Sequence, residues 1–332
     1  MTKKILVIGG AGYIGSHVVD SLCSLGHDVT VFDNLSSGFK ENLSGKYENV
    51  GKSEKYNSPK LIVGDILNLH DLEQVFSKGF DVVMHFAALK NVGESMMHPE
   101  KYAQTNIVGT LNILNMMAKH NVKSIIFSSS AAVYGTPKYL PIDENHPVNP
   151  ESFYGFTKLD IEKYLEWYSK IYKIHFAALR YFNAAGYTSG KCKEKNPGNL
   201  LPIVMEVAAG LRKEVQIYGN DYETTDGTGV RDYIHVLDLA DAHVKAMDYI
   251  LQNKKNIIVN LSTEKGNSVL DIIKKAEEIT GRKIHYKIVD RRAGDTATVV
   301  ASSGLANKLL GWKPEHSDID TIIRSMWEVY KN

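Results

Sequence analysis

Short apolar runs alternate with amphipathic stretches through the first half of the chain. The runs are rich in β-branched and aromatic residues and lack a polar alternation, which is typical of strands buried on both faces of a sheet. They lie at Ile5–Gly9, Val29–Asp33, Leu61–Gly64, Asp81–Phe86, Ser124–Ser128 and His175–Tyr181. With helices between them, this pattern predicts an α/β fold built on a doubly wound parallel sheet with right-handed crossovers, the Rossmann arrangement.

Two long helices are predicted near Glu100–His120 and near Ser152–Tyr172. Both carry apolar residues on more than one face, so one face can cover the sheet while another remains to be covered. Burial inside the monomer and pairing with a second copy explain this pattern equally well. We carry a homodimer forward as the expectation.

The pattern becomes less regular after Tyr181. Strands are predicted at Val215–Tyr218 and Asn256–Leu261, and long loops at Thr188–Asn199 and Gly219–Gly229. We therefore expect a cofactor-binding Rossmann domain over residues 1–181 and a smaller α/β substrate-binding domain over 182–332, with single elements free to cross this boundary. The polar segment Lys40–Lys60 is predicted to be a surface loop.

Composition and charge narrow the function. The chain has 332 residues, is 43% hydrophobic and carries a formal net charge of +1, so neither nucleic acid nor a membrane surface is an expected partner. Cys23 and Cys192 are the only cysteines, too few for a disulfide framework or a cysteine-rich metal site. The apolar start is short and broken by glycines, unlike a signal peptide, and no segment is long enough to span a bilayer. We expect a cytoplasmic protein without a metal.

A glycine motif marks the end of the first predicted strand. The sequence GGAGYIG can be read with Gly9, Gly12 and Gly15, or with Gly10 in place of Gly9. At a strand-to-helix turn, such glycines permit a tight turn, close approach of a pyrophosphate to the backbone and close helix–strand packing, with the helix N-terminus facing the anion. A glycine-rich turn without a ligand is the alternative.

Two carboxylates follow the next two strands. Asp33 ends the second strand about 20 residues after the glycines, where a carboxylate binds the adenosine ribose and repels a 2′-phosphate, so it favours NAD over NADP. Capping of the following turn is its other possible role. Asp65, after the third strand, is placed to approach the adenine.

Tyr154 and Lys158 stand at the start of the second long helix, in the stretch SFYGFTK. Free tyrosine has a pKa near ~10 and free lysine near ~10.4, so neither is an obvious catalyst at neutral pH. One helical turn apart they share a face, and the ammonium can favour the phenolate. The pair therefore predicts a general base, although an aromatic residue and a surface lysine also occur at this spacing by chance.

At this point several motifs resemble a known family. The segments GGAGYIG, VFDNLSSG, HFAALKNVGES, YGFTK, LRYFNAAG and GNDYETTDGTGVRDYIHVLDLADAH are similar to those of the extended short-chain dehydrogenases, and among these to the UDP-glucose 4-epimerase family. The resemblance extends from about Lys3 to Trp312. It implies inversion of carbon 4 of a UDP-hexose by a bound NAD, through a transient 4-keto sugar.

The resemblance also implies residue roles. Tyr154 would be the base, Lys158 would hold the nicotinamide ribose and lower the tyrosine pKa, and Ser130 would relay the proton. The other implied NAD contacts are Gly9, Gly12, Tyr13, Ile14, Gly15, Asp33, Asn34, Asp65, Ile66, Phe86, Ala87, Lys90, Asn106, Ser128, Tyr181 and Phe182. The implied UDP-sugar contacts are Lys90, Ser130, Tyr154, Asn183, Asn199, Leu200, Gln216, Tyr218, Arg231, Arg292, Asp295 and Val299. Two guanidinium groups suit a diphosphate, although a local salt bridge would explain Arg231 and a solvated turn Arg292.

Three positions depart from the family pattern. Phe153 replaces a proline before the catalytic tyrosine, and Ala184 replaces a proline after Asn183. Val299 stands where the family varies between a bulky tyrosine and smaller residues. Because valine leaves room beside carbon 2 of the sugar, we expect N-acetylated UDP-hexosamines to be accepted as well.

Other functions remain to be weighed. A nucleotide-sugar dehydratase commonly has an Asp-Glu pair after the serine run, where this chain has Ala131 and Ala132. A 4-epimerase of UDP-pentose or UDP-glucuronate shares the core chemistry and stays open. An NAD-binding regulator without catalysis would need no Tyr–Lys pair, and the 12 histidines show no spacing that suits a metal hydrolase.

Overall fold

A computed structural model of the chain describes residues 1–43, 57–188, 191, 197–292 and 295–331. Most of the loop predicted at Lys40–Lys60 and part of the one at Thr188–Asn199 lie outside these residues. The predicted loop at Lys40–Lys60 begins with a short 3-10 helix, η1 (Lys40–Leu43).

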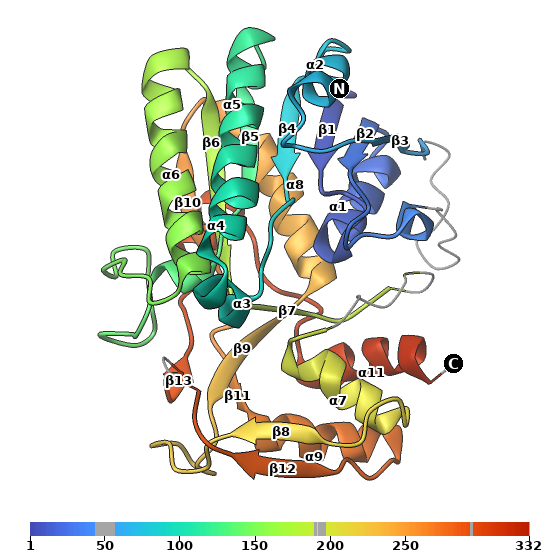
Figure 1. Cartoon of the computed structure of the whole chain (residues 1–332), viewed down its shortest axis with the longest axis vertical. Helices are drawn as coiled ribbons and strands as arrows, with labels where there is room; N and C mark the ends of the chain where they lie inside the picture. The colour runs from blue at the N-terminus through green and yellow to red at the C-terminus, as the bar shows by residue number, and fades with distance from the viewer. Residues whose placement is uncertain (44–56, 189–190, 192–196, 293–294, 332) are drawn as a thin grey trace.

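A seven-stranded sheet forms the upper half of the molecule (Figure 1). Its order is β10-β6-β5-β4-β1-β2-β3, and every pair is parallel. The strands are β1 (Lys4–Ile8), β2 (Asp28–Asp33), β3 (Lys60–Val63), β4 (Val82–His85), β5 (Ser124–Ser128), β6 (His175–Tyr181) and β10 (Ile257–Leu261). The predicted doubly wound Rossmann sheet is confirmed.

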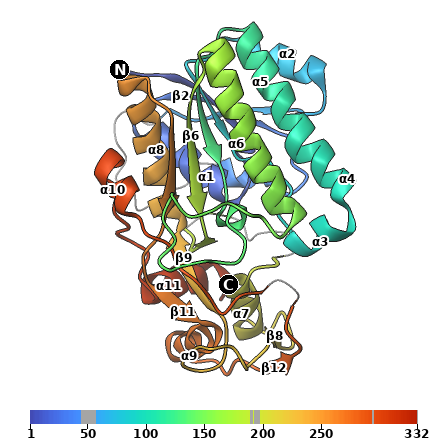
Figure 2. The same ribbon diagram turned by 90° about the vertical axis from the view of Figure 1, so that its left-hand side faces the viewer.

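Two layers of helices cover this sheet and explain its continuous apolar runs. Helices α1 (Tyr13–Ser24), α8 (Val236–Asn253) and α10 (Gly304–Leu310) pack on one face, in a core that includes Val7, Leu22 and Trp312. Helices α2 (Leu69–Phe76), α5 (Gly109–Lys119) and α6 (Phe153–Tyr172) pack on the other, around Leu6, Phe127 and Leu165. Figure 2 shows α5 and α6 side by side on the outside of the molecule.

The strand order reverses between β1 and β4. From β1 the chain moves outward to β2 and β3, then returns to β4 and proceeds through β5 and β6 in the opposite direction. Open α/β sheets bind ligands in the crevice at such a reversal, which here falls outside the carboxyl ends of β1 and β4.

A smaller α/β portion lies below the carboxyl edge of the sheet (Figure 1). Strands β11 (Gly266–Ser268), β9 (Val230–His235) and β13 (Thr298–Val299) form one small sheet, to which β7 (Asn183–Ala185) adds through β9. Strands β8 (Val215–Tyr218) and β12 (Tyr286–Val289) form another. Helices α7 (Leu200–Ala208), α9 (Val269–Thr280) and α11 (Ile319–Tyr330) enclose a separate core with these strands.

Two elements differ from the sequence prediction. Ile257–Leu261, expected with the second half, extends the large sheet beside β6, because its apolar run suits a strand covered on both faces. The helix expected near Glu100–His120 is divided into α4 (Pro99–Tyr102), a π-helical turn η2 (Ala103–Val108) and α5. Strand β10 and helix α8 belong with the large sheet, so both cross the predicted boundary at residue 181. The division of the chain into two domains at that residue stays a prediction.

Candidate active site

The glycine loop connects β1 to α1 at the crevice. Gly9 has φ +80, and a Cβ there would lie 2.5 Å from the Ala87 backbone nitrogen. A Cβ on Gly15 would lie 2.4 Å from the Gly9 carbonyl oxygen. Gly12, the N-cap of α1, makes no side-chain cap and has only that oxygen, at 3.3 Å, near its Cβ position. The turn is therefore fixed by Gly9 and Gly15, while Gly12 leaves the helix N-terminus open to an anion.

The first two residues of α1, Tyr13 and Ile14, pack against different cores. Tyr13 donates from its hydroxyl to the Gly186 carbonyl at 2.5 Å, so the start of α1 is tied to the chain that follows β7. Ile14 packs against the core under α1 and α8.

The acidic residues lie where predicted, at the carboxyl ends of β2 and β3. Asp33 is buried and accepts the backbone N–H groups of Ala11 (3.0 Å) and Leu35 (2.8 Å), one on each oxygen. It thus caps its own turn and also joins the glycine loop, so the two roles weighed from the sequence are compatible. Asn34 donates to Asp65 at 2.9 Å, which brings these side chains together beside the loop.

The segment after β4 forms the other wall of the crevice. Phe86 packs against His243 of α8 with ring centroids 4.8 Å apart and the rings tilted by 40°, and the Ala87 N–H donates to the Ile8 carbonyl. Lys90 follows as an exposed residue, and Ile66 lies buried in the core beneath α2 and α5.

Asn106, predicted to line the cofactor site, lies in the π-helical turn and is 1% exposed. Its amide bonds both backbone groups of Leu89, at 2.8 and 3.0 Å, and the Thr157 hydroxyl at 3.1 Å. These contacts tie the segment after β4 to α6. Irregular helical turns of this kind are frequent at functional sites.

Tyr154 and Lys158 stand in the first turns of α6, which begins where the sequence predicts. Ser152 caps the helix by accepting the Gly155 N–H, and Ser95 accepts the Tyr154 N–H at 3.1 Å. Lys158 is 3% exposed and donates to the Ser128 carbonyl at 2.7 Å. Its Nζ lies 5.8 Å from the Tyr154 ring centroid. Ser130, after β5, forms a hydrogen bond with Tyr154, so the predicted triad is brought together.

Burial dominates the ionisation of this pair. It raises the pKa of Tyr154, which the hydrogen bond from Ser130 partly opposes. It lowers the pKa of Lys158 to about 7, which the carboxylate of Glu162 partly opposes. The lowered tyrosine pKa expected from the Tyr–Lys spacing is therefore not produced by the protein groups alone. A cation held beside the phenol would favour the phenolate and oppose the effect of burial.

Tyr181 and Phe182 border the same region. Ser128 and Tyr181 share a short hydrogen bond between their hydroxyl groups, and burial raises the Tyr181 pKa well above its usual value. Phe182 and Val299 pack against a buried cluster that includes Val133, Tyr134 and Leu159. This cluster connects the catalytic helix to the smaller portion of the molecule.

The predicted UDP-sugar residues gather around β8, β9 and β13. Arg231 is paired with Val299 across β9 and β13, and its guanidinium lies 3.8 Å from the Asp295 carboxylate. The Arg292 guanidinium stacks 3.7 Å from the centre of the Tyr218 ring. The Asp295 N–H donates to the Arg292 carbonyl at 3.2 Å, so the arginines, the acid and the aromatic ring lie within one surface, and each arginine has a partner in the protein.

The remaining predicted positions lie in strands β7 and β8 and at the start of helix α7. Gln216 accepts from the Tyr218 hydroxyl at 2.8 Å. Asn183, in β7, donates to the Asp232 carbonyl at 2.9 Å. Asn199 is the N-cap of α7, and Leu200 is its first residue.

Three buried polar residues near the centre were missed from the sequence. Ser95 supports the helix that carries Tyr154, while Glu162 and Arg180 form an ion pair at 2.6 Å beneath Lys158. A signal for the pair was present, because Glu162 lies one turn after Lys158 and Arg180 interrupts an apolar strand. For Ser95, 59 residues from its partner, the sequence offered none.

The described residues include neither a membrane-spanning helix nor a metal-binding cluster. None of their helices is long and apolar enough to cross a bilayer. The same residues hold no group of three or more His, Cys, Asp or Glu side chains placed to bind a metal ion.

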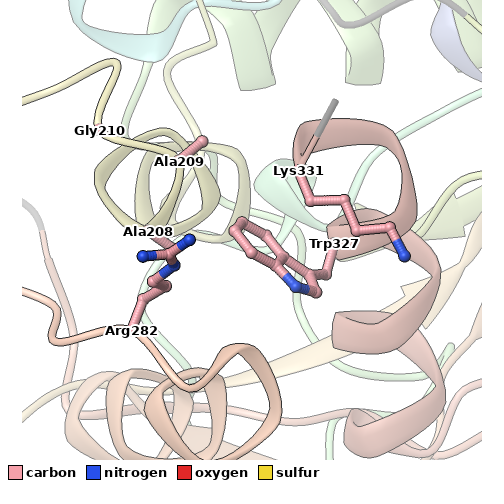
Figure 3. Close-up of a pocket in the computed structure, with 6 residues that line it drawn as sticks. All are labelled: Ala208, Ala209, Gly210, Arg282, Trp327 and Lys331. Carbon is pink, nitrogen blue, oxygen red and sulfur yellow. The ribbon is translucent and has the colours of Figure 1, made fainter.

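A separate hollow of about 270 Å³ lies beside α7 and α11 (Figure 3). Its lining residues are Ala208, Ala209, Gly210, Arg282, Trp327 and Lys331. None of them is a candidate site residue, so we assign the hollow no part in the chemistry.

The chain is similar to one family model and to many proteins named UDP-glucose 4-epimerase. Residues 6–326 match the family described as GDP-mannose 4,6 dehydratase. The protein named UDP-glucose 4-epimerase of Lacticaseibacillus casei is 43% identical over 99% of this chain and 97% of its own. The crystal structure of UDP-glucose 4-epimerase from Brucella ovis in complex with NAD is 39% identical, with a TM-score of 0.92 over 99% of both chains. That of the Bifidobacterium longum enzyme in complex with NAD+ and UDP is 41% identical, with a TM-score of 0.90 over 98% of this chain and 97% of its own.

The buried Lys158 predicts a pH-dependent stability. Its folded pKa of about 7 lies below the unfolded value of ~10.4. Between these values the unfolded chain binds more protons, so stability rises with pH over that window. We expect Lys158→Met to be more stable than the wild type at pH 6. As pH rises from 7 toward 10, this difference should shrink by up to about 1.4 kcal/mol per pH unit.

Urea unfolding of both proteins between pH 6 and pH 10 measures this difference. Lys163→Met, at an exposed position of the same helix, is the control and should follow the wild type. A difference between wild type and Lys158→Met that stays constant with pH would contradict the lowered pKa.

Proposed function

Because the chain belongs to the UDP-glucose 4-epimerases within the broader epimerase/dehydratase family, we propose that it inverts carbon 4 of UDP-glucose and UDP-galactose with a bound NAD. The observation that carries this proposal is the triad of Tyr154, Lys158 and Ser130 at the end of β5. It stands beside a crevice whose glycine loop and Asp33 suit a dinucleotide.

NAD fits the residues present. The pyrophosphate would lie at Gly12, where the N-terminus of α1 is open. A side chain at this position would occupy the space of the pyrophosphate. Asp33 keeps lone pairs on both oxygens for the adenosine ribose, and its charge disfavours a 2′-phosphate. Lys158 would reach the nicotinamide ribose from α6. When bound, NAD would take the hydrogen of sugar carbon 4 as hydride and later return it.

Tyr154 would act as the base. Its phenolate accepts the proton of the 4-hydroxyl group while carbon 4 is oxidised, and the same phenol returns it when the keto group is reduced. Ser130, bonded to Tyr154, would hold the sugar oxygen and relay the proton. The ammonium of Lys158, fixed by the Ser128 carbonyl, favours the phenolate.

The uridine diphosphate would anchor the substrate while its sugar turns. Arg231 and Arg292 present guanidinium groups suited to a diphosphate, and Asp295 lies beside Arg231 to receive the uridine ribose. Because these groups hold only the nucleotide, the 4-keto sugar can present either face to the cofactor, and the configuration at carbon 4 can invert without net oxidation.

A conversion assay tests the function. The purified protein is incubated with UDP-galactose without added NAD, and the products are separated by chromatography. We expect UDP-glucose to form, because the cofactor is regenerated in each cycle and stays bound. Failure to convert UDP-galactose even with NAD supplied would contradict the proposal, and UDP-pentoses and UDP-glucuronate would then be tested.

A dehydratase activity is the rival suggested by the wider family. Its acid–base pair would follow the serine run, where a 3-10 helix, η3 (Ala131–Val133), presents two alanines. Alanine transfers no proton, so this site favours epimerisation.

We extend the proposed substrates to N-acetylated UDP-hexosamines. Val299 is partly buried, packs with Phe182 on the cluster beside the catalytic helix, and pairs with Arg231 of the diphosphate surface. A short side chain at this junction leaves room for a substituent on carbon 2.

Val299→Tyr tests this extension. We expect the variant to lose at least about ten-fold in kcat/KM for UDP-N-acetylgalactosamine, corresponding to about 1.4 kcal/mol, and to keep UDP-galactose activity. Both rates are measured on the same preparation. Equal loss of both substrates would contradict a role for Val299 in size selection.

The proposed assembly is a homodimer formed through α5 and α6. On α6, Phe156, Trp167 and Ile171 lie on one face and are exposed, Trp167 by 59% and Ile171 by 62%. Val108, preceding α5, is also exposed. An apolar stripe on the outermost helices is best covered by the same stripe of a second copy.

A cytoplasmic location, where nucleotide sugars would be available, is also part of the proposed function.

Trp167→Glu combined with Ile171→Glu tests the assembly. We expect sedimentation to shift from dimer to monomer, because two charges would be buried at the contact. Leu211→Glu, at a residue 64% exposed in the smaller portion, should leave the dimer intact. A dimer that survives the double substitution would exclude this interface.

A further inference from the structure

One buried carboxylate lies beneath the catalytic lysine. Glu162 is 2% exposed and follows Tyr154 and Lys158 at successive intervals of four residues on α6, so the three share a helical face. A carboxylate is rarely buried without partners. Its partners therefore show what it holds.

Glu162 joins helix α6 to two strands of the sheet, at the end of β5 and in β6. Its Oε1 accepts the Ser129 hydroxyl at 2.6 Å and the Arg180 Nε–H at 2.9 Å, and its Oε2 accepts from the other side of the same guanidinium at 2.6 Å. Ser129 stands between Ser128, whose carbonyl holds Lys158, and Ser130, which bonds Tyr154. One carboxylate thus fixes the strand end that contacts both catalytic side chains.

Arg180 is held on its far side as well. It donates to the Tyr134 hydroxyl at 2.9 Å, and Tyr134 donates to Asn260 of β10 at 2.7 Å. Glu144, which accepts the Asn260 N–H at 2.7 Å, lies at the end of this network. The guanidinium is therefore held by Glu162 on one side and by Tyr134 on the other.

Resting on the proposed 4-epimerase function, we propose that Glu162 is a positioning residue for that reaction: it holds the Ser128–Ser130 strand end against α6 and keeps Lys158 in the ammonium form that Tyr154 requires. Glu162 touches neither reacting atom, and its effect reaches the substrate through Lys158 and Ser130.

The other groups around Lys158 do not replace this charge. His85 of β4 faces it, and burial together with Lys158 lowers the pKa of this histidine to about 3, so the imidazole is neutral at pH 7. From β5, Lys158 meets the Phe127 ring at 4.8 Å and the Ser128 carbonyl. Tyr181 of β6 is protonated at neutral pH because burial raises its pKa. Glu162 is the group that raises the pKa of Lys158.

The sign of the effect follows from these contacts. Removing the carboxylate lowers the pKa of Lys158 further, and neutral Lys158 no longer favours the phenolate. Tyr154 then keeps its proton to higher pH, so the acid limb of the kcat profile moves upward. The KM for the UDP-sugar should stay within about two-fold, because Glu162 makes no contact with the substrate surface.

Glu162→Gln is the first variant. We expect the acid limb to move up by about one pH unit and kcat at pH 7 to fall about ten-fold. Glu166→Gln, one turn further along α6 at an exposed position, is the matched control and should reproduce the wild-type profile.

A double variant separates positioning from folding. Glu162→Gln leaves the Arg180 charge buried without its carboxylate, whereas Glu162→Met with Arg180→Met replaces both by apolar chains of similar length, a change that buried ion pairs often tolerate. We expect the double variant to fold and its acid limb to move in the same direction. A double variant with the wild-type profile would show that the stranded guanidinium caused the first effect, and would overturn the proposal.

The activity of the wild type separates a failure of the proposed epimerase function from a failure of the proposed role of Glu162. If it fails to convert UDP-galactose, the epimerase function falls, and this inference falls with it. If it converts UDP-galactose and Glu162→Gln keeps both kcat and the pH profile, only the role of Glu162 is overturned.

Discussion

The site depends on the interaction between the Lys158 ammonium and the Tyr154 phenol, which are buried one helical turn apart. Burial works against both charged forms, raising the pKa of Tyr154 and lowering that of Lys158 to about 7. Two groups oppose this effect on Lys158: the Ser128 carbonyl, which accepts a hydrogen bond from the ammonium at 2.7 Å, and the carboxylate of Glu162. A cationic nicotinamide would add the remaining charge that favours the phenolate.

The rest of the architecture brings ligands to this pair. Reversal of the strand order between β1 and β4 opens the crevice, and Gly9 lies against Ala87 across it. Asn106 ties the chain after β4 to α6. On the other side, β7 follows Tyr181 directly and pairs with β9, which carries Arg231. A nucleotide held by the smaller portion would therefore place its sugar at the catalytic helix.

Local patterns predicted most of the fold and the catalytic pair. Buried strands, the glycine turn and the start of α6 depend on neighbouring residues, and the structure has them where the sequence placed them. Contacts between distant residues could not be read this way: Ser95 supports Tyr154 from 59 residues away, and Ile257–Leu261 joins β6 rather than the smaller portion. Burial raises the pKa of Tyr154 in the protein groups alone, and helical spacing does not reveal this effect, because burial is a property of the folded chain.

The substrate side shows a different limit. From the residues alone, Arg231 and Arg292 suited a salt bridge or a solvated turn as well as a diphosphate, and in the structure both have protein partners, Asp295 and Tyr218. The family resemblance, rather than spacing or charge, predicts that they bind a diphosphate. Their roles in binding therefore stay predictions, while the geometry of the triad is observed.

Running the conversion of UDP-galactose in D2O tests the central claim most directly. If Tyr154 handles only the hydroxyl proton and the hydrogen on carbon 4 travels through the bound cofactor, the UDP-glucose formed should carry no deuterium at carbon 4 by NMR. Solvent deuterium at that carbon would show that a carbon-bound proton is exchanged, and would contradict an oxidation–reduction at this site.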